Sequence, residues 1–190
     1  DSTDGSDEFW INSSAEANDG SVEAYGLLGG VNSYLTTGIG SDNIYIQANA
    51  RGEINNVFAD SSLSIGIQNY QIDLGEGVNL LDVQANASGL ASQAVAVRQS
   101  TITSGTGPDL FSFNAESSNT NSSGSSISIG LEDTTLNVND GDDTVAINSR
   151  TNFGTGTLSA FGLLGNGDGS AVIDTGSGDD RVSISAAATA

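Results

Sequence analysis

The chain has 190 residues and a formal net charge of −20, because its 24 Asp and Glu residues are balanced by only four Arg and no Lys. Such an acidic surface repels phosphate groups and anionic lipids, which argues against nucleic-acid binding and electrostatic membrane docking. The absence of Cys and His excludes disulfides, zinc–thiolate sites and thiol or imidazole catalysis. Carboxylate, amide and carbonyl oxygens are therefore the atoms left to bind cations.

No apolar run approaches the roughly 18 residues of a membrane helix, so we expect no membrane insertion. The N-terminal residues DSTDGSDEFW lack the pattern of a signal peptide. A chain without Lys suits an extracellular or high-salt setting, and we expect the protein outside the cell or at the cell surface.

A nine-residue phrase recurs six times. It reads Gly, any residue, Asp or Asn, any residue, apolar, any residue, apolar, an amide or Ser, and Ala or Ser. Its copies begin at Gly5, Gly40, Gly77, Gly107, Gly141 and Gly178. The spacings of 35, 37, 30, 34 and 37 residues fall within the period of roughly 20 to 50 residues that is typical of stacked repeats. Residues 1–190 are therefore predicted to form a single solenoid domain, with incomplete first and last rungs.

The phrase ends in the first strand of each predicted rung. Its two apolar residues alternate with polar ones, the period-two pattern of a half-buried strand. The inward pairs are Phe9 and Ile11, Ile44 and Ile46, Leu81 and Val83, Phe111 and Phe113, Val145 and Ile147, and Val182 and Ile184. The residues between them are expected to face outward: Trp10, Tyr45, Asp82, Ser112, Ala146 and Ser183.

Two polar or small columns follow these pairs. An amide or hydroxyl column is expected to hydrogen-bond along the solenoid axis; it comprises Asn12, Gln47, Gln84, Asn114, Asn148 and Ser185. A small-residue column comes next and is expected at a tight bend; it comprises Ser13, Ala48, Ala85, Ala115, Ser149 and Ala186.

Two further strands are predicted between consecutive phrases. One lies in EAYGLLG, SLSIGIQN, QAVAVRQ, SISIGLED and SAFGLLGN, and a shorter one surrounds Leu35, Ile72, Ile102, Leu136 and Ile173. Connections rich in Ser, Asn and Gly, around residues 18–21, 50–61, 117–125 and 150–156, are predicted loops. Three short strands and three bends per repeat predict an all-β fold, a single parallel β-helix (β-solenoid) of about six rungs of 30–37 residues.

Acidic residues concentrate at the corner that precedes the first strand. Glycines at alternate positions, such as Gly75 and Gly77, permit the positive φ of a sharp turn there. Stacking in register would place carboxylates roughly 5 Å apart, where each like-charge pair costs about 1 kcal/mol in water. A Ca²⁺ ion would offset this repulsion, because it accepts about six to eight oxygen ligands. Asp and Asn are also ordinary turn residues that bind their own backbone, so a purely structural role stays open.

The corner motif Gly-x-Gly-x-Asp-x-apolar resembles the RTX, or haemolysin-type, calcium-binding repeat, whose stacked turns bind Ca²⁺. The resemblance covers the six corners, within rungs longer than those of the family. It implies Ca²⁺ as the cofactor, bound along one edge of the molecule. The candidate metal ligands are Asp7, Asp42, Asn79, Asp109, Asp140, Asp142, Asp143, Asp179 and Asp180.

These features favour a structural or assembly function, as a Ca²⁺-stiffened fibre subunit, surface-layer part or adhesin segment. The ends of a solenoid are open strand edges that invite pairing with another chain. We therefore expect head-to-tail self-association or further rungs in a larger parent protein.

Two other function classes stay open. One is recognition of a polysaccharide or an ice surface, since Trp10 and Tyr45 are adjacent in the outward column and could stack on a sugar. The other is a polysaccharide lyase or epimerase. The four Arg fall on different parts of the rung, and no Lys or His joins them, so we expect no enzymatic activity.

Overall fold

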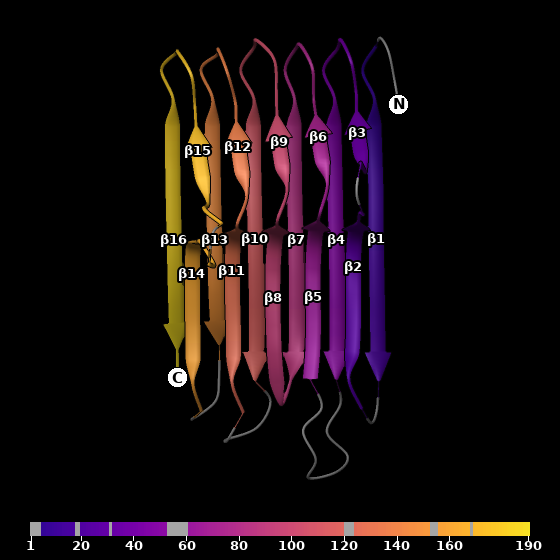
Figure 1. Ribbon diagram of the computed structural model, residues 1–190, viewed down its shortest axis with the longest axis vertical. Coiled ribbons are helices and arrows are strands. Elements are labelled where there is room, and N and C mark those ends of the chain that lie inside the picture. Colours follow the sequence, from indigo (N-terminus) through magenta and orange to yellow (C-terminus); the bar gives the residue numbers. More distant parts are fainter. Residues whose placement is uncertain are drawn as a thin grey trace.

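The computed structural model describes residues 5–17, 20–30, 32–52, 61–119, 124–152, 156–167 and 169–190. All regular secondary structure in these residues is β-strand (Figure 1). They contain no helix that could span a bilayer.

Sixteen strands form three parallel sheets, and each sheet takes one strand from every rung. The long sheet contains β1 (Glu8–Ala17), β4 (Asn43–Gly52), β7 (Leu80–Gly89), β10 (Leu110–Asn119), β13 (Thr144–Asn152) and β16 (Arg181–Thr189). The middle sheet contains β2 (Val22–Leu28), β5 (Ser61–Gln68), β8 (Ala91–Arg98), β11 (Ser126–Glu132) and β14 (Leu158–Leu164). The short sheet contains β3 (Tyr34–Thr36), β6 (Gln71–Asp73), β9 (Thr101–Thr103), β12 (Thr135–Asn137) and β15 (Val172–Asp174).

This arrangement confirms the predicted all-β parallel solenoid with three strands per rung. The strands pair in the register of the repeated phrase, so that Phe9 lies beside Ile44, Ile44 beside Leu81 and Phe111 beside Val145. The long sheet has six strands and the other two sheets have five, which gives about five turns. In each turn the long strand runs in one direction, and the middle and short strands return end to end in the other (Figure 1).

The hydrophobic core lies between the long sheet and the two returning sheets. The inward pairs of the inner rungs, such as Ile44 and Ile46, are essentially inaccessible to solvent. They pack in one cluster with Ile72, Ile102 and Leu136 of the short sheet. Each inner rung therefore buries its apolar side chains against the rungs on either side as well as across the core.

The predicted bend at the small-residue column is wrong. The long strands continue for several residues past Ala48 and Ala85, and both side chains are buried against the middle sheet. Cα atoms of β4 and β5 approach within 8 Å of one another, closer than the roughly 10 Å that is usual for packed sheets. Small side chains make this approach possible, and hydroxyls bridge it: Ser64 Oγ donates to the Ala48 carbonyl at 2.8 Å.

The loops start later than predicted, because the long strands continue past the small-residue column. β4 runs to Gly52, β10 to Asn119 and β13 to Asn152, whereas the sequence predicts loops from residues 50, 117 and 150. Most of the loop residues, namely 18–19, 53–60, 120–123 and 153–155, lie outside the described residues.

Two features require glycine at the corners: a positive φ and the close approach of the neighbouring rung. A substitution at Gly77 tests both. Gly77 has a φ of 128°, and a Cβ atom there would lie 1.7 Å from the Gly40 carbonyl oxygen of the neighbouring rung. We expect Gly77→Ala to lower the free energy of unfolding by at least about 3 kcal/mol in urea denaturation. The matched control is Gly30→Ala, whose Cβ would meet no atom within 4 Å. Equal, small losses in both variants would contradict the tight stacking of the corners.

Candidate functional site: the acidic corner

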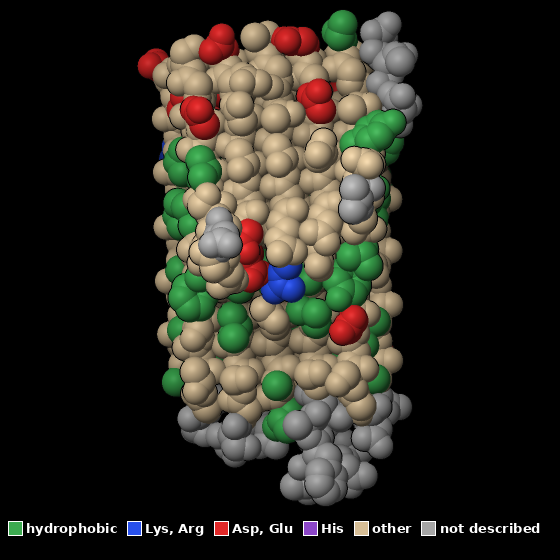
Figure 2. All heavy atoms as spheres, in the orientation of Figure 1, with side chains coloured by type: hydrophobic (Ala, Val, Ile, Leu, Met, Phe, Trp, Pro, Cys, Tyr) green, Lys and Arg blue, Asp and Glu red, His purple; other side chains and the backbone are tan. Residues whose placement is uncertain are grey.

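The acidic corner joins the end of each short strand to the start of the next long strand. All corners lie along one edge of the molecule, because every sheet stacks its strands in register. Acidic side chains gather at the upper end of the face shown in Figure 2, where these corners lie. The predicted alignment of the corners is therefore confirmed.

The Asp and Asn residues at the third position of the phrase form a hydrogen-bonded ladder. In each rung the main-chain N–H of this residue donates to Oδ1 of its counterpart in the next rung. The five bonds run from Asp7 to Asp42 (2.8 Å), Asp42 to Asn79 (3.1 Å), Asn79 to Asp109 (2.8 Å), Asp109 to Asp143 (2.8 Å) and Asp143 to Asp180 (3.0 Å). We call these six residues the corner ladder.

The inner members of the corner ladder are buried. Asp42, Asn79, Asp109 and Asp143 are each 3% exposed or less. Oδ1 of each carboxylate is bound to the neighbouring rung, but Oδ2 of Asp42, Asp109 and Asp143 is buried without a hydrogen-bond partner in the described structure. A buried, unpartnered carboxylate oxygen is costly, so a cation or a further hydrogen-bond donor at each of these atoms would stabilise the fold.

Burial changes the acidity of the corner ladder. Burial raises the pKa of Asp109 from its ordinary 3.8 to about 6, an effect that the nearby Ser104 hydroxyl and the Asn79 N–H oppose and that the Asp143 charge reinforces. Burial also raises the pKa of Asp143; the N–H of Asp109 opposes this shift, and the charges of Asp180 and Asp142 add to it. In both residues desolvation outweighs hydrogen bonding.

The remaining candidate ligands are separate from the ladder. Asp140, Asp142 and Asp179 are exposed on the outside of the last two corners. Oδ1 of Asp142 accepts the N–H of Asp179 at 2.9 Å, and Asp140 accepts the hydroxyl of Ser177. The nine candidates therefore form an inward set of six and an outward set of three.

The inward set fits a cation in donor type. Asp109 and Asp143 occupy successive rungs, and each has one buried oxygen without a partner. Within the described ranges no three acidic side chains are grouped so that they could hold one metal ion together. A Ca²⁺ ion at the ladder would therefore take most of its roughly six to eight ligands from other oxygens, such as main-chain carbonyls.

Sequence reasoning missed two polar contacts between neighbouring rungs. Arg98 and Glu132 form a largely buried ion pair between β8 and β11, whose register places them side by side. Glu76, which was not among the candidates, accepts the Thr106 N–H at 2.9 Å, and hydrogen bonds from Thr106 lower its pKa. The available signal for the ion pair was the opposite charge at the same place in consecutive repeats.

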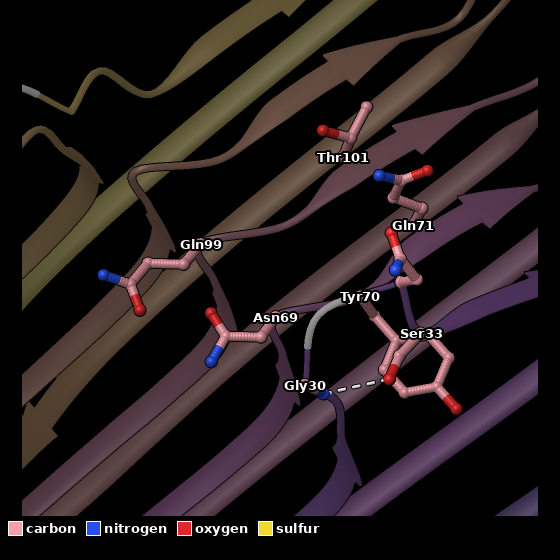
Figure 3. A pocket seen from close by; sticks show the side chains of 8 residues that line it. Gly30, Ser33, Asn69, Tyr70, Gln71, Gln99 and Thr101 are labelled. Atoms are coloured by element: carbon pink, nitrogen blue, oxygen red, sulfur yellow. Dashed lines mark hydrogen bonds between the residues drawn. The ribbon is translucent and has the colours of Figure 1, made fainter.

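A hollow at the bend between the middle and short sheets is chemically different from the corner. Asn69 and Gln99 line it from neighbouring rungs, in left-handed backbone conformations (Figure 3). Other lining residues include Ser33, whose Oγ accepts the Gly30 N–H at 2.9 Å, and Tyr70. Its described lining residues carry amides and hydroxyls but no carboxylate or guanidinium, so they offer hydrogen bonding without a group suited to proton transfer at neutral pH.

Comparisons with protein-family models, with curated proteins and with solved structures gave no match. The resemblance to the RTX repeat therefore rests on the corner motif alone.

The raised pKa of Asp109 predicts a specific dependence of stability on pH. A carboxyl group with a higher pKa in the folded than in the unfolded state stabilises the fold fully below the unfolded value. This contribution is lost as the pH rises through the folded value. Between about pH 4 and pH 7, Asp109 should therefore cost the fold roughly 3 kcal/mol.

The test is urea denaturation of the wild type and of Asp109→Asn across this pH range. Asn79 shows that an amide fits the ladder, so Asp109→Asn should fold and should lose less stability than the wild type between pH 4 and pH 7. Identical pH slopes for the two proteins would contradict the buried ladder.

Proposed function

We propose that this chain is a structural and assembly protein. It is an extracellular β-solenoid segment whose end strands pair with further rungs. The exposed interior at the ends of the solenoid supports this proposal most directly. Val182 and Ile184 of β16 are 44% and 49% exposed, whereas their counterparts Val145 and Ile147 in β13 are inaccessible. Apolar side chains exposed beside a strand edge favour strand pairing with a partner.

The partner proposed for this edge is a second copy stacked head to tail. Continuing the register of the long sheet beyond β16 would place Val182 beside Phe9 and Ile184 beside Ile11 of the next copy. Arg181 would then lie beside Glu8, an opposite-charge pair. Because the middle and short sheets have one strand fewer than the long sheet, this joint is made through the long sheet. Further rungs of a larger parent protein would cover the same edge.

Substitutions on β16 test the joint. We expect Ile184→Lys to abolish end-to-end association, because it puts a charge into the apolar contact, while Ser183→Lys on the opposite face of the same strand leaves association intact. Sedimentation velocity and negative-stain electron microscopy over a concentration series measure the difference. A wild-type chain that stays monomeric at all concentrations would contradict self-association and favour further rungs as the partner.

The proposed role of Ca²⁺ is to stiffen the corner. The unpartnered oxygens of Asp109 and Asp143 support it, because a cation between successive rungs would supply their missing partner and reduce the repulsion of their charges. The net charge of −20 also favours cation binding. With Ca²⁺ bound, the ladder would hold adjacent rungs together by metal ligation as well as hydrogen bonds.

Chemical denaturation in Ca²⁺ or in a chelator tests this role. A Ca²⁺ concentration 100 times the Kd should raise the free energy of unfolding by about 2.7 kcal/mol. The double variant Asp109→Asn with Asp143→Asn should lose this gain, whereas Glu116→Gln, at an exposed position of β10, should keep it. Stability that is indifferent to Ca²⁺ would show that the ladder is held by protons and hydrogen bonds instead.

Surface recognition is the second candidate function. An ice-binding face requires a flat array of threonines, but other residues interrupt the outward columns of the short sheet. Gln71 lies beside Thr101 in one column, and Thr103 lies between Asp73 and Asn137 in the other. Carbohydrate recognition is favoured by the stacked rings of Trp10 and Tyr45 on the long sheet.

A further inference from the structure

The outer face of the long sheet carries two stacked aromatic side chains, and a carboxylate follows them in the same column. Trp10 and Tyr45 occupy the same outward column on β1 and β4, with ring centroids 4.1 Å apart and planes inclined by 17°. Trp10 is 71% exposed. The next residue in the column is Asp82, whose short side chain cannot continue the ring stack. The column therefore changes from aromatic to carboxylate between β4 and β7.

A hollow lies where the column changes from aromatic to carboxylate, between this column and the neighbouring amide column. Trp10, Tyr45 and Asp82 line it from one column, and Asn12, Gln47 and Gln84 line it from the other. Gln84 Nε2 donates to Asp82 Oδ2 at 3.0 Å, which holds the carboxylate and the amide together. Aromatic surface, a carboxylate and planar amides thus meet within one shallow depression.

A second hollow adjoins the first along the solenoid axis. It shares Gln84 and continues over Asn114, Glu116, Asn148 and Arg150. Asn148 Nδ2 donates to Asn114 Oδ1 at 3.0 Å, so the amide column is preorganised in this stretch. The two hollows share Gln84, so polar side chains line this outer face over several rungs, starting at the aromatic rings.

This combination is suited to a sugar chain. A pyranose ring presents apolar C–H faces, which pack on aromatic rings, and hydroxyls that both donate and accept hydrogen bonds. Amides and carboxylates are matched partners for such hydroxyls, and a groove with a few placed polar groups beside aromatic surface is typical of ligand sites. The net charge of −20 disfavours an anionic polysaccharide.

We propose that the outer face of the long sheet binds a neutral glycan chain along the solenoid axis. Tyr45 and Trp10 provide the aromatic platform, and Asp82 and Gln84 bind the sugar hydroxyls beside it. The site uses the outer face of β1, β4 and β7, whereas the joint uses the edges and inward residues of β16 and β1, so Ile184→Lys on β16 blocks the joint and leaves every residue of the site in place. Loss of either function therefore leaves the other measurable.

The experiment uses Trp10 as its reporter, because it is the only Trp in the chain. The full chain is titrated with cellohexaose, chitohexaose and laminarihexaose, and with oligogalacturonate as an anionic control of similar length. At least one neutral oligosaccharide should shift the emission of Trp10 and protect it from acrylamide quenching. The anionic control should leave the emission unchanged.

Variants separate glycan binding from simple pairing of the two rings. Asp82→Ala and Gln84→Ala, which leave both rings in place, should each weaken binding at least about tenfold by isothermal titration calorimetry. Tyr34→Ala removes an exposed aromatic side chain on the short sheet and should bind as the wild type does. The proposal is overturned if no neutral oligosaccharide changes the emission at about 10 mM, a concentration that detects even millimolar Kd values. Unchanged affinity in the Asp82 and Gln84 variants, or equal binding of oligogalacturonate, would also overturn it.

Discussion

Each rung of this solenoid depends on the rung beside it, and the corner ladder is the clearest form of that dependence. A main-chain N–H in one rung has its acceptor on the side chain of the next. The acceptor is charged in four of five cases, and hydrogen bonds to charged groups are stronger than neutral ones. Burial of the same carboxylates works in the opposite direction and raises the pKa of Asp109 and Asp143. The corner is therefore a balance between strong bonds to the neighbouring rung and the cost of desolvating charge.

The rest of the molecule follows from the same stacking. The register that aligns the ladder also aligns the apolar pairs, so that β7, a long strand of an inner rung, has a buried residue at every inward position. A rung at an end lacks one neighbour, and β16 is exposed along its whole length. The core consists of contacts that repeat from rung to rung, so an end rung can still make the same contacts with another chain. This is the physical basis of the proposed assembly. Outward side chains also contact one another between rungs, as Asn148 and Asn114 do, but they face solvent and remain available for binding.

Much of this fold could be predicted from the sequence, because the apolar alternation at residues such as Ile44 and Ile46 is local and repeats in register. The role of the small residues could not. Ala48 is compatible with a tight bend or with close sheet packing, and only its partner Ser64, sixteen residues away, decides between them. The inward direction of Asp109 was equally hidden, since the Gly-x-Gly-x-Asp pattern permits a carboxylate on either side of the turn. The pairing of Arg98 with Glu132 depends on the register of the middle sheet, which the phrase itself does not include.

Amide hydrogen exchange at the corners measures the central claim most directly. The N–H groups of Asp42, Asn79, Asp109 and Asp143 are donors in the ladder and lie on buried residues. Resolved by NMR, they should exchange as slowly as the amides at the centre of β7, through unfolding of the solenoid rather than local opening. Exchange at the rate of an exposed turn would contradict the account, because it would mean that the corner side chains face solvent and do not join one rung to the next.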